Sequence, residues 1–356
     1  MKKINVCVLF GGVSPEHEVS LRSAESVLSN MDPEKYNIFP VGITKNGEWI
    51  LYGGTDYSWL PTGRWLEHPG NRPAVISPVR GQGLVTFEND CAVQTVPDVV
   101  FPVLHGENGE DGAMQGLLQL SGIPYVGPHV SASAVAMDKT LTKLVMDHEG
   151  IPQADWVLVR KSELPGRMDA AVARVEEKFT YPVFVKPAGT GSSVGVSKAV
   201  DRESLISALD HAGQFDEKIL VEEFVPGKEI EVAVIGNNSP AASVCGEIDS
   251  GAEFYDYDAK YVTDTSVAYI PARIDEETAE KVRELAVQAY RAVGSQGLSR
   301  VDFFVTHTDN RIVFNEINTL PGFTSISMYP KLFAASGIPY GQLIDELINL
   351  ALEAFA

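Results

Sequence analysis

Short hydrophobic runs separated by glycine-rich turns dominate the N-terminal third of the chain. The runs over residues 4–10, 36–43 and 96–104 are largely apolar, and such runs are typical of strands buried on both faces of a sheet. A Gly-Gly turn follows the first run, and a Ser-Pro pair then favours the start of a helix with the proline in its first position. These elements predict a doubly wound α/β domain. Residues 53–83, rich in Gly, Pro and Trp, predict an irregular peripheral region.

Alternation of polar and apolar residues marks a second region near the C-terminus. Residues 300–304 and 312–318 predict two strands joined by a turn at Asp309 and Asn310. One face of the first strand would carry Arg300, Asp302 and Phe304. One face of the second strand would carry Ile312, Phe314, Glu316 and Asn318. Oxygen atoms at one end of this hairpin would converge beside an arginine, and such oxygens hold Mg²⁺ while leaving room for phosphates. The alternative is a surface hairpin with solvated polar ends.

Glu16 and His105 each lie at the carboxyl end of a predicted strand, where open α/β sheets bind ligands. Glu16 would be the second residue of the first helix, and the alternative is that it only complements the helix dipole. His105 opens a segment over residues 105–112 whose glycines let the backbone approach a ligand closely, although a lone histidine is often structural. The first turn lacks the full G-x-G-x-x-G pattern, so a dinucleotide site is not expected.

A predicted strand over residues 181–186 delivers Lys186 into a Gly/Ser-rich loop over residues 187–196. Backbone N–H groups and hydroxyls of such a loop can bind phosphate oxygens, and the lysine adds positive charge. The loop does not have the Walker A sequence. Further on, Glu222, which is one of an acidic pair, and Glu229 are candidates to accept hydrogen bonds from an adenine amino group and ribose hydroxyls. Solvated charge is the alternative for one member of the pair.

Composition narrows the class of protein. The 356 residues are enough for two or three domains, and contents of 44% hydrophobic and 21% charged residues are typical of a soluble globular protein. We expect a cytoplasmic protein without a membrane partner, because no apolar run could cross a bilayer and no signal peptide precedes the first strand. Three widely spaced cysteines predict reduced thiols. The net charge of −20 argues against nucleic acid as a partner.

Taken in order, the motifs resemble those of the D-alanine:D-alanine ligase family of ATP-grasp enzymes, which includes D-alanine:D-lactate and D-alanine:D-serine ligases. The resemblance runs from residue 6 nearly to the C-terminus. It rests on FGGVSPEHEVS, HGENGEDG, MDK, YPVFVKPAGTGSSVGV, EEFVPGKE, FYDYDAKY, SRVDFF and NEINTLPGFTSISMYP. Each motif alone is weak, whereas the ordered series is highly specific.

The resemblance implies an α/β protein with a three-domain ATP-grasp fold. Its N-terminal Rossmann-like domain would span residues 1–128, the central ATP-grasp subdomain residues 129–225, and the C-terminal subdomain residues 226–356. The implied reaction joins two D-alanines through a D-alanyl phosphate, at the expense of ATP, for peptidoglycan precursor synthesis. A homodimer is also implied.

The same resemblance implies roles for individual residues. Those placed with ATP are Lys139, Lys186, Glu222, Val225, Glu229 and Phe304. Two Mg²⁺ ions, with Mn²⁺ as a possible substitute, would be held by Asp302, Glu316 and Asn318. Arg300 and the backbone N–H of Gly322 would stabilise the oxyanion of the tetrahedral intermediate. The residues placed with the amino-acid substrates or with closure over them are Glu16, His105, Ser192, Lys260, Tyr261, Ser327 and Met328.

Tyr261 bears on the choice among branches of the family. D-Lactate-preferring members usually carry a histidine in the corresponding loop, whereas this chain has Lys260 and Tyr261, so depsipeptide formation is not expected. D-Serine as the second substrate stays the alternative, because an apolar pocket rejects one extra hydroxyl only weakly, by about 10²-fold. Other carboxylate–amine ligases are disfavoured by FYDYDAKY and PEHEVS. A nucleotide-binding protein without catalysis is disfavoured because the hairpin's polar residues are intact.

Overall fold

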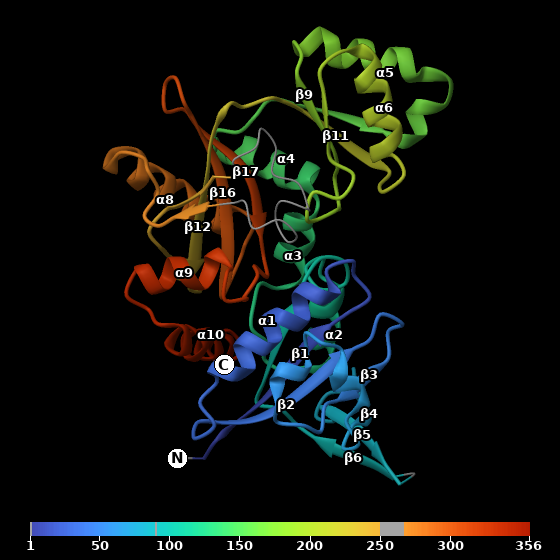
Figure 1. The fold of residues 1–356 in the computed structure, drawn as a ribbon, viewed down its shortest axis with the longest axis vertical. Coiled ribbons are helices and arrows are strands. Elements are labelled where there is room, and N and C mark those ends of the chain that lie inside the picture. The colour runs from blue at the N-terminus through green and yellow to red at the C-terminus, as the bar shows by residue number, and fades with distance from the viewer. Residues whose placement is uncertain (1, 90, 250–266) are drawn as a thin grey trace.

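The computed structural model describes residues 2–89, 91–249 and 267–356, and these residues form three β-sheets with helices packed around them (Figure 1). The N-terminal sheet lies at one end of the molecule and the central sheet at the other, with the C-terminal sheet between them. No helix within the described ranges is both long enough and apolar enough to span a membrane.

The N-terminal sheet has the strand order β6-β5-β4-β3-β2-β1-β7. Its parallel strands are β1 (Ile4–Gly11), β2 (Tyr36–Ile43) and β7 (Val99–Leu104), and its antiparallel strands are β3 (Trp49–Leu51), β4 (Arg72–Ile76), β5 (Leu84–Glu88) and β6 (Cys91–Thr95). Val6 and Val8 of β1 enter one core cluster, while Cys7 and Leu9 enter another. Burial on both faces explains the continuous apolar run.

The helices of this domain are α1 (His17–Asn30) and α2 (Ala113–Ser121), with 3₁₀ turns at Tyr57–Trp59 and Arg64–Glu67. The predicted start of the first helix is wrong, since Glu16 is the N-cap residue of α1 and not its second residue. The cause is a turn before the helix, in which Ser14 Oγ accepts a hydrogen bond from the Glu16 N–H at 3.1 Å. The region over residues 53–83 is also less irregular than predicted, because β4 pairs with β3 and β5 there.

The central sheet has the order β10-β9-β11-β8 and is antiparallel throughout. Its strands are β8 (Trp156–Arg160), β9 (Val183–Pro187), β10 (Ser197–Ala199) and β11 (Lys218–Glu223). The associated helices are α3 (Val130–Met137), α4 (Lys139–Glu149), α5 (Leu164–Lys178) and α6 (Arg202–Ala212), with a 3₁₀ turn at Lys161–Glu163. Valines of β9 and β11 pack against apolar residues of α5 and α6 in one core cluster, so this sheet is covered by helices on one side (Figure 1).

The C-terminal sheet has the order β15-β14-β12-β16-β17, with β13 paired to β12. Its strands are β12 (Gly227–Ile235), β13 (Ala241–Ala242), β14 (Gly246–Asp249), β15 (Val267–Tyr269), β16 (Leu298–Thr306) and β17 (Ile312–Asn318). Its helices are α8 (Glu276–Ala292), α9 (Met328–Ala335) and α10 (Tyr340–Ala354). Val27 of α1 and Leu343 and Leu347 of α10 belong to one core cluster, so buried apolar contacts join the N-terminal and C-terminal domains.

The predicted hairpin is present as β16 and β17, but its second strand is not regular. Arg300 lies opposite Asn318 and Asp302 opposite Glu316, after which the register shifts so that Phe303 lies opposite Phe314. The prediction that Phe314 shares a face with Glu316 is therefore wrong, because the bulge places one extra residue between them. The Phe314 ring instead packs on Phe303, with ring centroids 5.9 Å apart.

The central and C-terminal sheets meet at the short connection between β11, which ends at Glu223, and β12, which begins at Gly227. This connection forms part of the cavity described below. The predicted domain limits at residues 128 and 225 stay predictions.

Candidate active site

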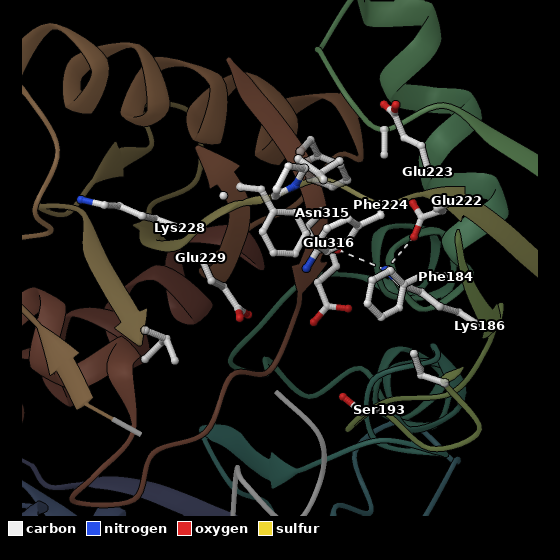
Figure 2. A pocket seen from close by; sticks show the side chains of 18 of the residues that line it. Phe184, Lys186, Ser193, Glu222, Glu223, Phe224, Lys228, Glu229, Asn315 and Glu316 are labelled. Atoms are coloured by element: carbon white, nitrogen blue, oxygen red, sulfur yellow. Dashed lines mark hydrogen bonds and ion pairs between the residues drawn. The ribbon is translucent and has the colours of Figure 1, made fainter. Parts of the chain in front are cut away.

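A cavity of about 460 Å³ lies between the central and C-terminal sheets, and its size suits a small-molecule ligand. Eight of the predicted site residues line it: Lys139, Lys186, Ser192, Glu222, Val225, Glu229, Phe304 and Glu316. Figure 2 shows Lys186 and Glu222 facing each other in this cavity, near Glu229 and Glu316. The cavity therefore brings together residues that are far apart in the sequence.

Glu222 is shared by two lysines at one side of the cavity. Lys143 Nζ lies 2.5 Å from Glu222 Oε1, and Lys186 Nζ lies 2.6 Å from Glu222 Oε2. Burial acts to raise the pKa of Glu222, but the two lysines prevail and lower it to about 2. Because one carboxylate faces two ammonium groups, the cluster carries a net positive charge beside the cavity.

Lys143 is a site residue for which the sequence analysis gave no role. Its side chain is fully buried, and its Nζ also contacts the carbonyl oxygen of Ala154 at 3.3 Å. Lys143 lies one helical turn after Lys139 on α4, and this i, i+4 spacing was the available signal. The spacing alone could not show that a buried carboxylate from β11 would meet it.

Lys139 begins α4 and contacts the Gly/Ser loop. Its Nζ donates a hydrogen bond to the Thr190 carbonyl oxygen at 2.6 Å, and its backbone N–H donates to Ala188 O at 3.0 Å. Asp138 caps the helix by accepting hydrogen bonds from the N–H groups of Thr140 and Leu141, and it also pairs with Lys218. The cap and the loop contacts together hold Lys139 at the cavity wall.

Phenylalanine side chains form apolar parts of the cavity wall. The rings of Phe184 and Phe224 lie 5.9 Å apart between centroids, and Phe304 packs on a small buried cluster that includes Val225. Glu229 lies opposite Phe304 in the β12–β16 register. Apolar walls beside the Glu229 carboxylate fit a flat heteroaromatic base and an attached sugar.

Arg273 also lines this cavity and was not predicted. Its Nη2 lies 2.6 Å from Glu247 Oε1 and 2.9 Å from Asp249 Oδ2, and its guanidinium lies 3.5 Å from the Tyr269 ring centroid. The arginine therefore ties β14 to β15. No local sequence pattern signalled this, because the contact depends on the pairing of those two strands.

The polar end of the β16–β17 hairpin lies beside the cavity. Arg300 Nε and Nη2 donate to the two oxygens of Asp302 at 2.8 and 2.6 Å, and Asn318 Nδ2 donates to Asp302 Oδ2 at 2.9 Å. Glu231 of β12 lies opposite Asp302, and its Oε2 is 3.2 Å from Arg300 Nε. Burial acts to lower the pKa of Arg300, but Asp302 and Glu231 keep it raised, so the guanidinium stays charged.

Glu231 was missed by the sequence analysis, although it lies two residues after Glu229 on the same strand. The period of two was the available signal.

The hairpin's oxygen ligands fit a hard divalent cation. Across the described ranges, no group of three or more His, Cys, Asp or Glu side chains forms a metal cage. Asp302 and Glu316 instead offer two carboxylates on paired strands, next to the Asn318 amide. Mg²⁺ typically binds through one or two carboxylates and completes its coordination with water and substrate phosphates, so this set suits that ion.

Glu16 lies where the N-terminal domain meets the Gly/Ser loop. Its Oε1 accepts a hydrogen bond from Ser192 Oγ. A Cβ atom on Gly106 would lie 2.5 Å from Glu16 Oε2, and one on Gly191 would lie 3.1 Å from it. Because neither glycine has a side chain, the Glu16 carboxylate fits between Gly106 of the N-terminal domain and Gly191 of the central domain.

His105 is buried and contacts the segment that carries Gly322. Its Nε2 lies 3.0 Å from Ser23 Oγ, and its Nδ1 lies 3.0 Å from the Leu320 carbonyl oxygen. Burial lowers the pKa of His105, although the charge of Glu16 acts in the other direction. His105 is thus placed by its hydrogen bonds as a neutral ring near Glu16.

Ser327 and Met328 lie at the start of α9, close to Gly322. A Cβ atom on Gly322 would lie 2.7 Å from Ser327 Oγ, and this oxygen accepts a hydrogen bond from the Thr324 N–H at 3.0 Å. Met328 is buried against Gly246. The remaining two predicted residues, Lys260 and Tyr261, lie outside the described residues.

Two sheets that enclose a cavity with lysines, a Gly/Ser loop and paired carboxylates define an ATP-grasp enzyme, and the solved structures similar to this chain include a D-Ala:D-Ser ligase and a D-alanine–D-alanine ligase. The chain belongs to the D-alanine–D-alanine ligase family: the family's N-terminal model, D-ala D-ala ligase N-terminus, matches residues 5–128, and its C-terminal model matches residues 145–349. This family is ATP-dependent.

Relatives match over nearly the whole chain. A D-alanine–D-alanine ligase from Caldicellulosiruptor bescii is 51% identical over 99% of this chain and 96% of the relative, and one from Acetivibrio thermocellus is 48% identical over 99% and 97%. The VanG D-Ala:D-Ser ligase structure from Enterococcus faecalis has a TM-score of 0.89 and 39% identity, covering 98% of this chain and 100% of that one. The D-alanine–D-alanine ligase structure from Coxiella burnetii has a TM-score of 0.88 and 34% identity, covering 100% and 95%.

Proposed function

We propose that this chain joins two D-alanines into D-alanyl-D-alanine, with cleavage of ATP to ADP and phosphate, for peptidoglycan precursor synthesis. The observation that carries the proposal is the convergence of three domains. Glu16 of the N-terminal domain accepts a hydrogen bond from Ser192 of the central Gly/Ser loop, and Ser192 lines the same cavity as Glu316 of the β16–β17 hairpin. The full-length relatives named D-alanine–D-alanine ligase support the same reaction.

ATP is proposed to bind in the cavity between the two ATP-grasp sheets. Its base would lie between Phe184, Phe304 and the backbone near Val225, with the ribose near Glu229. Its phosphates would lie against the Gly/Ser loop with Lys139 and Lys186, whose positive charges offset those of the phosphates. Glu222 would act mainly on Lys186, by fixing the position of its ammonium group.

Asp302, Glu316 and Asn318 are proposed to hold the two Mg²⁺ ions, with Mn²⁺ as a possible substitute. When bound, these ions would supply charge neutralisation for the phosphoryl group during its transfer. The protein itself holds the two carboxylates in place. β-Pairing fixes Asp302 opposite Glu316, and hydrogen bonds from the Arg300 and Asn318 side chains orient the Asp302 carboxylate.

The first D-alanine is proposed to bind with its ammonium group against Glu16. Its carboxylate would attack the γ-phosphorus of ATP, so that a C–O–P bond forms, ADP leaves, and D-alanyl phosphate results. The amine of the second D-alanine would then attack the acyl carbon, and phosphate would leave after loss of a proton from that amine. Arg300 and the Gly322 N–H would stabilise the oxyanion that develops between these two events.

The second-substrate site is proposed to lie near Ser327 and Met328. Met328, one residue after Ser327, is buried in the core cluster and packs against Gly246. D-Serine is the second candidate, because a D-Ala:D-Ser ligase is 39% identical over 98% of this chain, but the relatives at 51% and 48% identity are named D-alanine–D-alanine ligase and favour D-alanine. The cytoplasmic location stays a prediction from the sequence pattern, and the homodimer stays a prediction from the family resemblance.

Competition between acceptors tests the proposed substrate. The enzyme is mixed with ATP, Mg²⁺ and D-alanine in three reactions: without a competitor, with an equal concentration of D-serine, and with an equal concentration of D-lactate. The products are separated and identified by mass spectrometry. We expect D-alanyl-D-alanine as the main product in all three mixtures. If D-alanyl-D-serine is the main product, the preferred second substrate is D-serine and not D-alanine. If no ligation product forms, the proposed function is wrong.

A further inference from the structure

The backbone segment that carries Gly322 belongs to the C-terminal domain but is held by the N-terminal domain. The Leu320 N–H donates a hydrogen bond to Glu110 Oε1 at 3.1 Å, and the Leu320 carbonyl oxygen lies 3.0 Å from His105 Nδ1. Both polar backbone groups of Leu320 are therefore bound by side chains of one N-terminal loop. Backbone groups bound in this way are restricted in position, because an alternative position would leave them unpaired.

A second anchor lies just beyond Gly322. The Phe323 N–H donates to Ser23 Oγ of α1 at 3.2 Å, and the Phe323 carbonyl oxygen accepts a hydrogen bond from Tyr340 Oη at 2.6 Å. Leu320 and Phe323 are also both buried in the core cluster that joins the two domains. Gly322 thus lies in a short stretch that is fixed on both sides.

Glu110 connects this stretch to the site around Glu16. Its other oxygen, Oε2, accepts a hydrogen bond from the Gly106 N–H at 2.7 Å, and Gly106 is the residue that packs directly beneath the Glu16 carboxylate. A single side chain therefore joins the backbone under Glu16 to the backbone before Gly322. The sequence analysis did not assign a role to Glu110, although it lies in the HGENGEDG motif.

The charge state of Glu110 fits this position. Loss of hydration and then the nearby Glu16 carboxylate raise its pKa to about 8, against the hydrogen bonds from Gly106 and Leu320 and the charge of Arg300. At neutral pH the Glu110 carboxyl is thus mostly protonated. It can accept both backbone hydrogen bonds without adding a second negative charge beside Glu16.

We propose that Glu110 is a positioning residue, which sets the distance between the first-substrate site at Glu16 and the oxyanion donor at the Gly322 N–H by binding Gly106 and Leu320 together. This inference rests on the proposed function, because Gly322 matters only if a tetrahedral intermediate forms there. Its physical basis is preorganisation: a donor that is already in place needs no rearrangement during the reaction, and a displacement of about 1 Å can cost about 10²-fold in rate.

The test compares Glu110→Ala and Glu110→Gln with Glu107→Gln, an exposed substitution in the same loop that serves as the control. In Glu110→Gln the amide oxygen can accept one backbone hydrogen bond, while the amide NH₂ faces the second N–H donor. Three quantities are measured: kcat with D-alanine, affinity for a non-hydrolysable ATP analogue, and hydrogen–deuterium exchange of residues 319–323 in the enzyme without substrates.

We expect kcat to fall about 10²-fold in Glu110→Ala and about 10-fold in Glu110→Gln, with analogue affinity within about 2-fold of wild type and unchanged behaviour of the control. Exchange at residues 319–323 should be faster in both Glu110 variants. This selective loss of kcat would not follow from general destabilisation, which would also weaken analogue binding.

Two results would overturn the assignment. Unchanged exchange at residues 319–323 would show that Glu110 does not hold the segment, and faster exchange with unchanged kcat would show that the contact has only a structural role. Failure of the proposed function is distinguishable, because the wild-type enzyme would then form no ADP with D-alanine, whatever the exchange experiment shows.

Discussion

Lys143, Lys186 and Glu222 form a buried cluster in which two lysines compete for one carboxylate. Lys143 is fully buried and contributes no surface to the cavity. Its ammonium group nevertheless pairs with one of the two Glu222 carboxylate oxygens, Oε1. Without it, Glu222 and Lys186 would form a neutral pair. The buried lysine thus leaves the cavity with a positive charge that phosphates can use.

Replacing Lys143 by Met should therefore reduce both stability and nucleotide binding. The substitution leaves the buried Glu222 Oε1 without its ion-pair partner, so we expect a loss of about 3 kcal/mol in the free energy of unfolding. It also removes the net positive charge beside the cavity, so an ATP analogue should bind more weakly. Urea denaturation and isothermal titration calorimetry measure the two effects. Lys281→Met is the matched control, since its exposed pair with Glu277 should contribute less than about 0.5 kcal/mol. Equal stability of the two variants would contradict this account.

The same cluster predicts a specific dependence of stability on pH. The pKa of Glu222 is lowered in the folded chain to about 2, so its contribution is present above its unfolded pKa, about 4.3, and is lost as the pH falls toward 2. The difference in unfolding free energy between wild type and Glu222→Gln should therefore be constant from pH 7 to 5 and shrink below pH 4.5. Denaturant unfolding at a series of pH values measures it, and two parallel curves down to pH 3 would refute the assignment.

At the scale of single elements, the β16–β17 hairpin shows what the pattern of residues can and cannot predict. Alternation placed Arg300, Asp302 and Phe304 on one face correctly, because β16 is regular. It failed for Phe314, because the bulge after the Asp302–Glu316 pair adds a residue that a period of two does not reveal. The bulge is a property of strand pairing, and a single strand's sequence carries little information about it.

The buried strands were predictable for a related reason. Residues 6–10 are apolar throughout because β1 is covered on both faces, so the apolar run alone identifies the strand. Lys143 and Arg273 were not predictable as site residues, since their partners come from other strands. The predicted first residue of α1 was also wrong. The Glu16 N–H donates a hydrogen bond to the Ser14 hydroxyl, and the helix begins only at His17.

Glu316→Gln tests the hairpin as a platform for divalent cations. Glutamine keeps the size of the side chain on β17 but removes its charge, so turnover should fall by at least about 10²-fold while the melting temperature changes by only a few degrees. Steady-state kinetics and calorimetry give the two values, with a Mg²⁺ titration to compare the concentration at half-maximal rate. Activity near that of wild type at low Mg²⁺ would remove Glu316 from the metal site.

At the scale of the whole molecule, the site depends on how three domains meet. The apolar core shared by α1 and α10 fixes the N-terminal domain against the C-terminal one, and the Glu16–Ser192 hydrogen bond adds the central domain. Through the family resemblance, the ordered motifs predicted eight residues that line the cavity. They could not predict the interdomain contacts of Leu320 with His105 and Glu110, which arise only when the domains are packed together.

The central claim is that this three-domain cleft couples ATP cleavage to ligation of D-alanine. The most direct measurement is the stoichiometry of the wild-type reaction, with ADP, phosphate and dipeptide quantified in the same sample containing ATP, Mg²⁺ and D-alanine. We expect one ADP and one phosphate for each D-alanyl-D-alanine, and no ADP above background without D-alanine. ADP release that is independent of D-alanine, or ADP formed without dipeptide, would contradict it.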